Sequence, residues 1–196
     1  MYKKQMTLQR ITSYLLLAAA ALVFVYSLGI MTDLHGSFAL ASSWKESKRY
    51  YFEGAKIYLE MQPFNRELTI AGIVLILSAA SLFLFKSHDR RKYYVANYIT
   101  IGINALANVG VSVWALIKVF SYKYQFVNNT DFEGFKAAAE MYKFPYLEPT
   151  DTFWFDISIL VFGILIAFTA LSIFNLVWKI VLMSQERKLI EEGKEN

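Results

Sequence analysis

The sequence predicts an all-α membrane protein with four transmembrane helices, arranged as two tandem repeats of two spans each. The chain has 196 residues, of which 56% are hydrophobic, and the apolar residues are concentrated in four long runs. Each run is close to or longer than the about 20 residues that a helix needs to cross roughly 30 Å of hydrocarbon. In addition, the pattern F-E-G-x-K-x-x-x-E-M occurs at residues 52–61 and again at 132–141, each time in a polar segment between two apolar runs. The predicted unit is therefore a span, a polar loop with a short helix, and a second span.

The first repeat is predicted to cover residues 1–86. Its two spans are the apolar runs at 11–31 and 68–85. In the loop between them, the capping-box pattern S-W-K-E supplies side chains that satisfy free backbone N–H groups at a helix start. Aromatic residues then recur at heptad spacing, which is typical of an amphipathic helix. We expect this extracytoplasmic helix at residues 43–61, ending near Pro63.

The second repeat is predicted to cover residues 97–183. Its spans are the apolar runs at 97–119 and 153–178. The polar loop again contains a capping box, T-D-F-E, which predicts an amphipathic helix at residues 131–143. This helix is expected to end before Pro145, because proline disfavours the helical conformation of the residue that precedes it.

Lysine and arginine residues favour one orientation of the spans. They are concentrated at the amino end, in a hinge predicted at residues 87–96 and at the carboxyl end, where we count Lys179 among them. By the positive-inside rule, both termini and the hinge lie in the cytoplasm and both polar loops lie outside. Residues 184–196 contain Lys, Arg and Glu at helical spacing with no helix breaker before Gly193. This pattern predicts a helical cytoplasmic tail.

Two tryptophans are predicted to anchor the last span in the lipid bilayer. Trp154 and Trp178 are 24 residues apart, or about 36 Å along a helix, which suits one indole in each interfacial belt. The chain contains no cysteine, and together with its Lys- and Ile-rich composition this favours a bacterial plasma membrane.

The duplicated motif has two interpretations. It forms either a duplicated docking surface for a membrane protein partner, or two structural helices that anchor the loops on the spans and present a solvated charged face. The candidate partner-binding residues are Phe52, Glu53, Lys56, Glu60, Phe132, Glu133, Lys136 and Glu140.

Polar side chains at helical spacing occur inside the third and fourth spans. They are Asn104, Asn108 and Ser112, and Thr169, Ser172 and Asn175. Polar groups in hydrocarbon need partners, so one interpretation is that they hold the two spans together. The other is a polar track that a solute follows through the membrane.

Few residues suggest bound metals, cofactors or catalysis. His35 and His88 fall on opposite sides of the predicted membrane, and the acids near Asp156 have irregular spacing. Asp156 lies near the amino terminus of the predicted span at 153–178, where the helix dipole favours a negative charge. Asn128 begins a glycosylation sequon, which has meaning only in a secretory eukaryotic protein. No catalytic, cofactor or metal residues are predicted, and the modest net charge of +4 gives no reason to expect nucleic-acid binding.

These observations favour a non-enzymatic accessory or scaffolding subunit of a larger membrane complex, such as a transporter or envelope assembly. Its partner is an integral membrane protein or a second copy of the chain. The alternative is a small oligomeric transporter or channel whose third span carries the polar stripe. A membrane enzyme that acts on lipid with Asp156 or the loop acids is the third hypothesis, and no visible base–nucleophile pair supports it.

Overall fold

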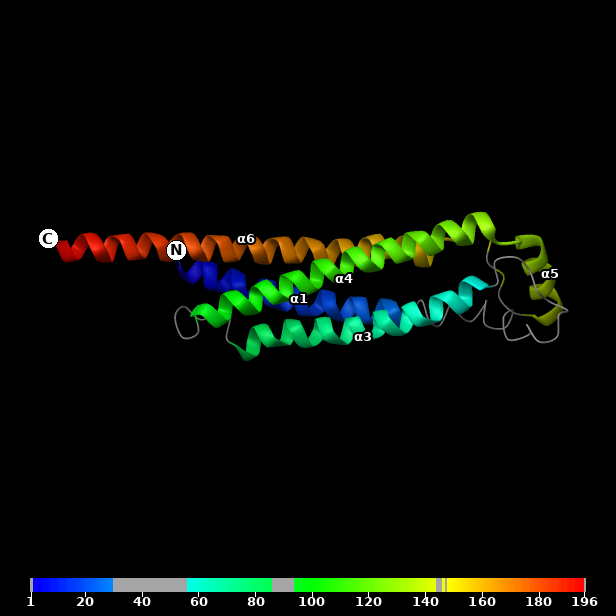
Figure 1. Ribbon diagram of the computed structural model, residues 1–196, viewed down its shortest axis with the longest axis horizontal. Helices are drawn as coiled ribbons and strands as arrows, with labels where there is room; N and C mark the ends of the chain where they lie inside the picture. Colours follow the sequence, from blue (N-terminus) through cyan, green and yellow to red (C-terminus); the bar gives the residue numbers. More distant parts are fainter. Residues whose placement is uncertain (1, 30–55, 86–93, 144–145, 147, 196) are drawn as a thin grey trace. The chain divides into compact units, whose positions relative to one another are not determined.

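The structure, a computed structural model, describes residues 2–29, 56–85, 94–143, 146 and 148–195 (Figure 1). These residues form helices and short connections and contain no strand. The helices are α1 (Tyr2–Gly29), α3 (Lys56–Leu84), α4 (Tyr94–Asn129), α5 (Phe132–Tyr142) and α6 (Phe153–Glu195). Four of them, α1, α3, α4 and α6, are long and apolar enough to cross a membrane. The predicted all-α class and the four spans are confirmed at this level.

Helix α3 is longer than the sequence predicted. A break near Pro63 was expected between an outer helix and the second span, but α3 runs through Pro63 without interruption. Ile57, Met61, Phe64 and Leu68 are all buried and lie on one helical face at spacings of three and four. Because the helix continues, this face stays buried on both sides of Pro63. That burial offsets the loss of the backbone hydrogen bond that proline cannot donate. Residues 43–55 of the expected outer helix lie outside the described residues.

The short helix α5 begins one residue later than its capping box predicted. The capping residue is Asp131, not Thr130, and the Asp131 carboxylate accepts a hydrogen bond from the Gly134 amide at 3.0 Å. Asp131 accepts from the third helical residue, as N-cap side chains commonly do. At the other end, Lys143 adopts a left-handed conformation with φ of 56° and donates its backbone N–H to Ala139. Both ends of α5 are therefore closed by local hydrogen bonds.

Helix α6 joins the predicted fourth span and the predicted tail in one element. It extends without a break from Phe153 to Glu195, as Figure 1 shows. The first and third spans also form longer helices than predicted, because α1 begins at Tyr2 and α4 ends at Asn129.

The chain divides into two compact units, and each long helix contributes to both. Unit 1 comprises Met1–Ala21, Val74–Val111 and Ile164–Asn196, and unit 2 comprises Leu22–Ile73 and Ser112–Gly163. In both units the exposed faces of the long helices carry many large apolar residues, such as Leu77, Leu106 and Leu160. Such faces suit contact with lipid rather than water.

Unit 2 has an aromatic core. The Phe126 ring lies 5.2 Å from the Phe132 ring and 5.5 Å from the Phe155 ring, measured between centroids. The Phe64 ring lies 5.3 Å from Trp114 and 5.6 Å from Tyr122. Tilted and edge-to-face contacts at these distances are favourable beyond the burial of apolar area. The aromatic core therefore joins α3, α4, α5 and α6 within unit 2.

Helices α1 and α3 approach closely at Gly72 in unit 2. A Cβ atom at Gly72 would lie 3.0 Å from the Phe24 Cα atom, which is backbone and cannot rotate away. We expect Gly72→Ala to lower the free energy of unfolding by about 1 kcal/mol, because overpacking forces the two helices apart. The measurement is unfolding of the detergent-solubilised chain in SDS, followed by tryptophan fluorescence. The matched control is Gly102→Ala, since a Cβ at Gly102 meets nothing within 4 Å. Equal stability of the two variants would contradict the close approach.

Candidate functional site

The interior of unit 1 is unusually polar for a bundle of membrane-spanning helices. It contains roughly as many buried polar side chains as buried apolar ones. The polar ones are Gln5, Gln9, Thr12, Ser13, Asn97, Asn104, Asn108, Thr169, Ser172, Asn175 and Lys179. Because hydrocarbon offers no hydrogen bonds, such groups must find partners inside the protein. Six of them belong to two groups joined by hydrogen bonds between side chains of different helices.

The first group connects α3, α4 and α6. The Asn104 Nδ2 atom donates to the Ser78 hydroxyl at 3.0 Å, and Asn108 Nδ2 donates to Asn104 Oδ1 at 3.1 Å. Asn108 Nδ2 also donates to the Thr169 hydroxyl at 3.0 Å, and that hydroxyl donates to the Leu165 carbonyl at 2.7 Å. Asn104 and Asn108 lie one turn apart on α4, so both side chains project toward the same neighbours. Three of the six polar residues predicted in the spans thus belong to one hydrogen-bond network.

The other three predicted residues are also buried. Ser172 and Asn175 follow Thr169 on α6, three and six residues further along, and lie in unit 1. Ser112 is buried in unit 2, one turn after Asn108 on α4.

The second group connects α1 and α6, and we call Gln5, Gln9 and Asn175 the amide cluster. The Gln5 Nε2 atom donates to Asn175 Oδ1 at 3.3 Å, and Asn175 Nδ2 donates to Gln9 Oε1. Gln5 and Gln9 are not among the predicted polar residues, because they precede the apolar run at 11–31. Their spacing of four residues, on a helix that starts at Tyr2, was the available signal for a shared face.

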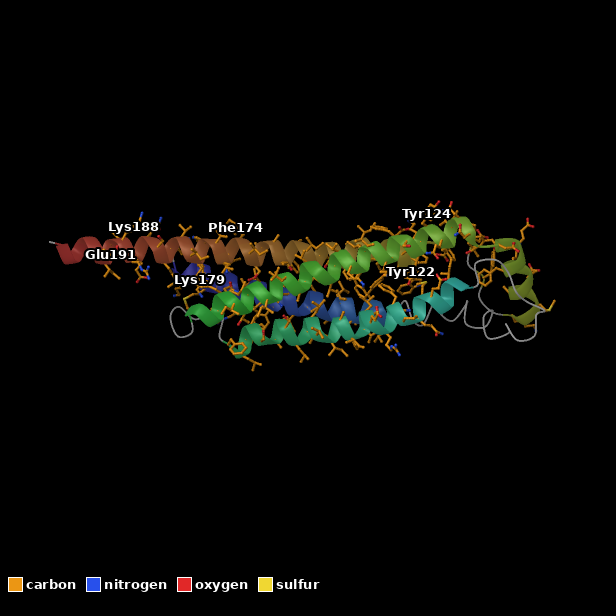
Figure 2. The ribbon with its side chains drawn as sticks, in the orientation of Figure 1. Tyr122, Tyr124, Phe174, Lys179, Lys188 and Glu191 are labelled. Carbon is orange, nitrogen blue, oxygen red and sulfur yellow. The ribbon has the colours of Figure 1, made fainter. Side chains whose placement is uncertain are left out.

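Lys179 lies one turn beyond Asn175 on α6 and is only 2% exposed. Its prediction as one of the cytoplasmic charges is corrected here, because Lys179 lies in the interior of unit 1. Its ammonium lies 5.9 Å from the centroid of the Tyr98 ring of α4, which is within range of a cation–π interaction. Figure 2 labels Lys179 and, on the exposed side of the same helix, Phe174. The spacing of Ser172, Asn175 and Lys179 continues one polar face, and this pattern was the signal that sequence reasoning overlooked.

Asp156 is engaged in local contacts at the start of α6 in unit 2. Its carboxylate accepts hydrogen bonds from the Lys123 ammonium and from the Thr152 hydroxyl. The Lys123 and Asp156 side chains are both partly exposed, so the ion pair adds little stability. Among the described residues, no group of three or more His, Cys, Asp or Glu side chains could hold a metal ion.

The two predicted tryptophan anchors are both half-buried. In unit 2, Trp154 packs on α1: its carbonyl accepts a hydrogen bond from the Tyr26 hydroxyl at 2.9 Å. Its ring also fills the space beside Gly29, where a Cβ would lie 2.6 Å from Trp154 Cζ3. Trp178 belongs to unit 1.

The second copy of the duplicated motif forms the surface helix α5. Phe135 is fully buried and its ring lies 5.5 Å from that of Tyr146, while Phe132 packs edge-on against Phe126. Three charged side chains of the motif are exposed; we call them the α5 charged face, namely Glu133, Lys136 and Glu140.

Only part of the first copy can be compared with the second. Phe52 and Glu53 lie outside the described residues, and Lys56 is the first residue of α3. The Glu60 side chain is exposed, and the Glu60 carbonyl accepts a hydrogen bond from the Tyr122 hydroxyl at 3.1 Å. Comparison of the whole chain with known proteins yields no significant match to a family model, a curated protein or a solved structure.

Proposed function

We propose that the protein is a non-enzymatic accessory or scaffolding subunit of a larger membrane complex and that α5 is one of its docking surfaces. The observation that carries this proposal is the two-sided character of α5. Its inner side buries Phe135 and Ala139 in unit 2, and its outer side presents Glu133, Lys136 and Glu140.

The contacts of α5 make it a preorganised surface. Asp131 closes one end, Lys143 closes the other, and Phe135 anchors the middle. A partner that binds a fixed helix does not have to order it, which lowers the entropic cost of association. Exposed charge pairs contribute little to folding stability, but they provide complementarity and orientation for a partner. These considerations support a binding role for the α5 charged face.

The distribution of basic residues supports an orientation for this function. Lys3, Lys4, Arg10, Arg187 and Lys188 are all exposed on unit 1. By the positive-inside rule, we propose that the two termini lie in the cytoplasm of a bacterium and that α5 faces the outside. In the same proposal the first copy of the motif, with exposed Glu60, supplies a second outer surface.

The test is reversal of the α5 charged face in the full-length chain. The variant carries Glu133→Lys, Lys136→Glu and Glu140→Lys, with an affinity tag at the carboxyl end. Wild-type protein extracted in mild detergent should co-purify with an integral membrane protein in fixed stoichiometry. The reversed variant should lose that partner about tenfold or more, because opposed charges across an interface become like charges.

A matched control keeps the fold and changes other exposed charges of unit 2. Arg66 and Glu67 are exposed neighbours on α3, and exchange of the two by Arg66→Glu and Glu67→Arg should leave the partner bound. Recovery of the wild-type chain as a homo-oligomer alone would overturn the accessory role. Retention of the partner by the reversed variant would overturn the assignment of α5 as its docking surface.

A second candidate function is a small oligomeric transporter or channel, and the polar interior of unit 1 favours it. Intramembrane polar and ionisable residues often line solute paths. Asn104, Asn108 and Thr169, however, donate to and accept from one another, and this mutual satisfaction favours a role in holding the helices together. The two roles predict different consequences of replacing Asn108 by leucine: loss of solute flux if it lines a path, and loss of stability if it holds the helices together.

A further inference from the structure

We propose that unit 2 binds an anionic phospholipid on the lipid-facing side of α4, with the Lys118 ammonium on the lipid phosphate and with Ser121 and Gln125 at the headgroup. This inference is independent of the docking role of α5, and it holds for either orientation of the chain in the membrane. It rests on an exposed lysine among exposed apolar side chains, on the depth of that lysine, and on the polar residues that follow it on the same helix.

Lys118 is an exposed cation within the stretch of α4 that can cross a membrane, Asn97–Asn129. Exposed apolar residues surround it on the same helix: Val113, Ile117 and Phe120 are 49%, 64% and 45% exposed. No acidic side chain of the described residues forms an ion pair with Lys118. A lysine on a lipid-facing surface extends its ammonium toward the headgroups, where a lipid phosphate can serve as its counter-ion.

The packing of α3 on α4 indicates the depth of Lys118. The Phe64 ring of α3 contacts the rings of Trp114 and Tyr122. Lys118 is midway between these two residues of α4, so Phe64 and Lys118 lie at about the same depth. The exposed charges of α3 at Arg66–Glu67 follow within one turn of Phe64. Because charges are costly in hydrocarbon, exposed charges at one depth on two neighbouring helices mark the level of the headgroups.

Two further features of unit 2 lie beyond Lys118 toward the end of α4. Lys123 forms an ion pair with Asp156 in the first turn of α6. Tyr124, labelled in Figure 2, is 68% exposed, and tyrosines are enriched at the interface between membrane and water. Lys118 precedes Lys123 by five residues, or about 7.5 Å along the helix. Lys118 therefore lies at the inner edge of the headgroup layer, where the phosphates are, rather than in bulk water.

Ser121 and Gln125 add polar atoms on the same side of α4. They follow Lys118 by three and seven residues, a spacing that places all three on one helical face. The Gln125 Nε2 atom donates to the Ser121 hydroxyl oxygen at 3.4 Å, and both side chains are at least partly exposed. From the membrane outward, the face presents a cation, a hydroxyl and a carboxamide. This order matches a phospholipid whose phosphate lies deeper than a headgroup that carries hydroxyls.

The charge of the site selects the class of lipid. In a zwitterionic lipid the headgroup ammonium already compensates the phosphate, and it would bring a second positive charge close to Lys118. In phosphatidylglycerol the phosphate is the only charged group, so one lysine balances it. We therefore name phosphatidylglycerol as the probe and phosphatidylcholine as the comparison.

The experiment is native mass spectrometry of the full-length chain, delipidated in a nonionic detergent and titrated with each lipid. The wild-type protein should bind its first phosphatidylglycerol molecule about fivefold or more tightly than phosphatidylcholine. Lys118→Gln should remove this preference, since one basic residue near a membrane surface raises the affinity for anionic lipid about fivefold. Lys118→Arg should keep it, because arginine retains the charge and binds phosphate. Lys136→Gln is the matched control, because Lys136 is an exposed lysine of α5 whose loss changes the net charge equally.

Four results would overturn the proposal. The first is a wild-type protein that binds both lipids equally. The second is equal loss of the preference in Lys136→Gln, which would show that net charge, and not the face of α4, selects the lipid. The third is displacement of phosphatidylglycerol by inorganic phosphate, which would identify a free anion as the ligand. The fourth is a Lys118→Gln variant that keeps the preference but unfolds more readily in SDS, which would show that Lys118 has a structural role instead.

Discussion

Replacement of Phe135 by alanine is expected to release α5 from unit 2 while the four long helices stay folded. Phe135 is 0% exposed, and truncation of a fully buried phenylalanine costs about 3 kcal/mol or more. The helix has only 11 residues, which is too short to be stable alone in water. Loss of its anchor should therefore unfold α5 locally as well as detach it.

The measurement is hydrogen exchange of the α5 amides by mass spectrometry. A loss of about 3 kcal/mol corresponds to about a hundredfold faster exchange, while peptides from α4 and α6 should keep their wild-type exchange rates. Met141→Ala is the matched control, because Met141 lies on the same helix and is 64% exposed. In the Met141→Ala variant the α5 amides should exchange at the wild-type rate. Uniformly faster exchange in all helices would instead show that α5 and the aromatic core unfold as one cooperative unit.

The same variant bears on the proposed function. The α5 charged face can bind a partner with little ordering cost only if α5 is held in place. Phe135→Ala should therefore weaken partner co-purification without altering any charge, and Met141→Ala should not. If Phe135→Ala releases α5 but leaves the partner bound, then docking does not depend on the position of α5.

The four spans could be predicted because the hydropathy of consecutive residues adds up along each apolar run. Each run is long enough to cross the hydrocarbon core of a bilayer as a helix, and this can be judged without knowing any contact between helices. The helix α5 was also predictable, since the capping pattern and Pro145 are local signals. The start of α5 was misplaced by one residue because Thr130 and Asp131 are both good capping residues, and only the observed bond from Gly134 to Asp131 distinguishes them.

The polar interior of unit 1 was predicted in part, and the omissions have a common cause. Asn104 and Asn108 stand out because they interrupt an apolar run, whereas Gln5, Gln9 and Lys179 adjoin the ends of apolar runs and resemble ordinary flanking residues. Whether such a residue faces solvent or the bundle depends on which helix covers it. That information lies in contacts between residues that are far apart in the chain, such as Gln5 with Asn175. The path of α3 through Pro63 has a similar origin, because burial of Phe64 and Leu68 outweighs a local helix-breaking preference.

Replacement of Asn108 by leucine is expected to destabilise unit 1. Asn108 donates to Asn104 Oδ1 and to the Thr169 hydroxyl, and leucine would leave the Asn104 oxygen without this donor in an apolar environment. We expect the free energy of unfolding to fall by about 2 kcal/mol, near the upper end of measured values for hydrogen bonds between membrane helices. The measurement is SDS-induced unfolding of the detergent-solubilised chain. Val109→Leu is the control, because Val109 adjoins Asn108 but is exposed, and it should leave stability nearly unchanged.

A double-mutant cycle with Thr169→Val separates a contact between helices from an effect on α4 alone. If the bond from Asn108 to Thr169 joins α4 and α6, the two substitutions should be less than additive, because either one removes the same interaction. The transporter hypothesis makes the opposite prediction: Asn108→Leu should abolish solute flux in liposomes while stability and assembly stay at wild-type values. A destabilised variant with non-additive coupling would therefore support the structural role, because a side chain that holds two helices together cannot be exchanged for leucine without loss of stability.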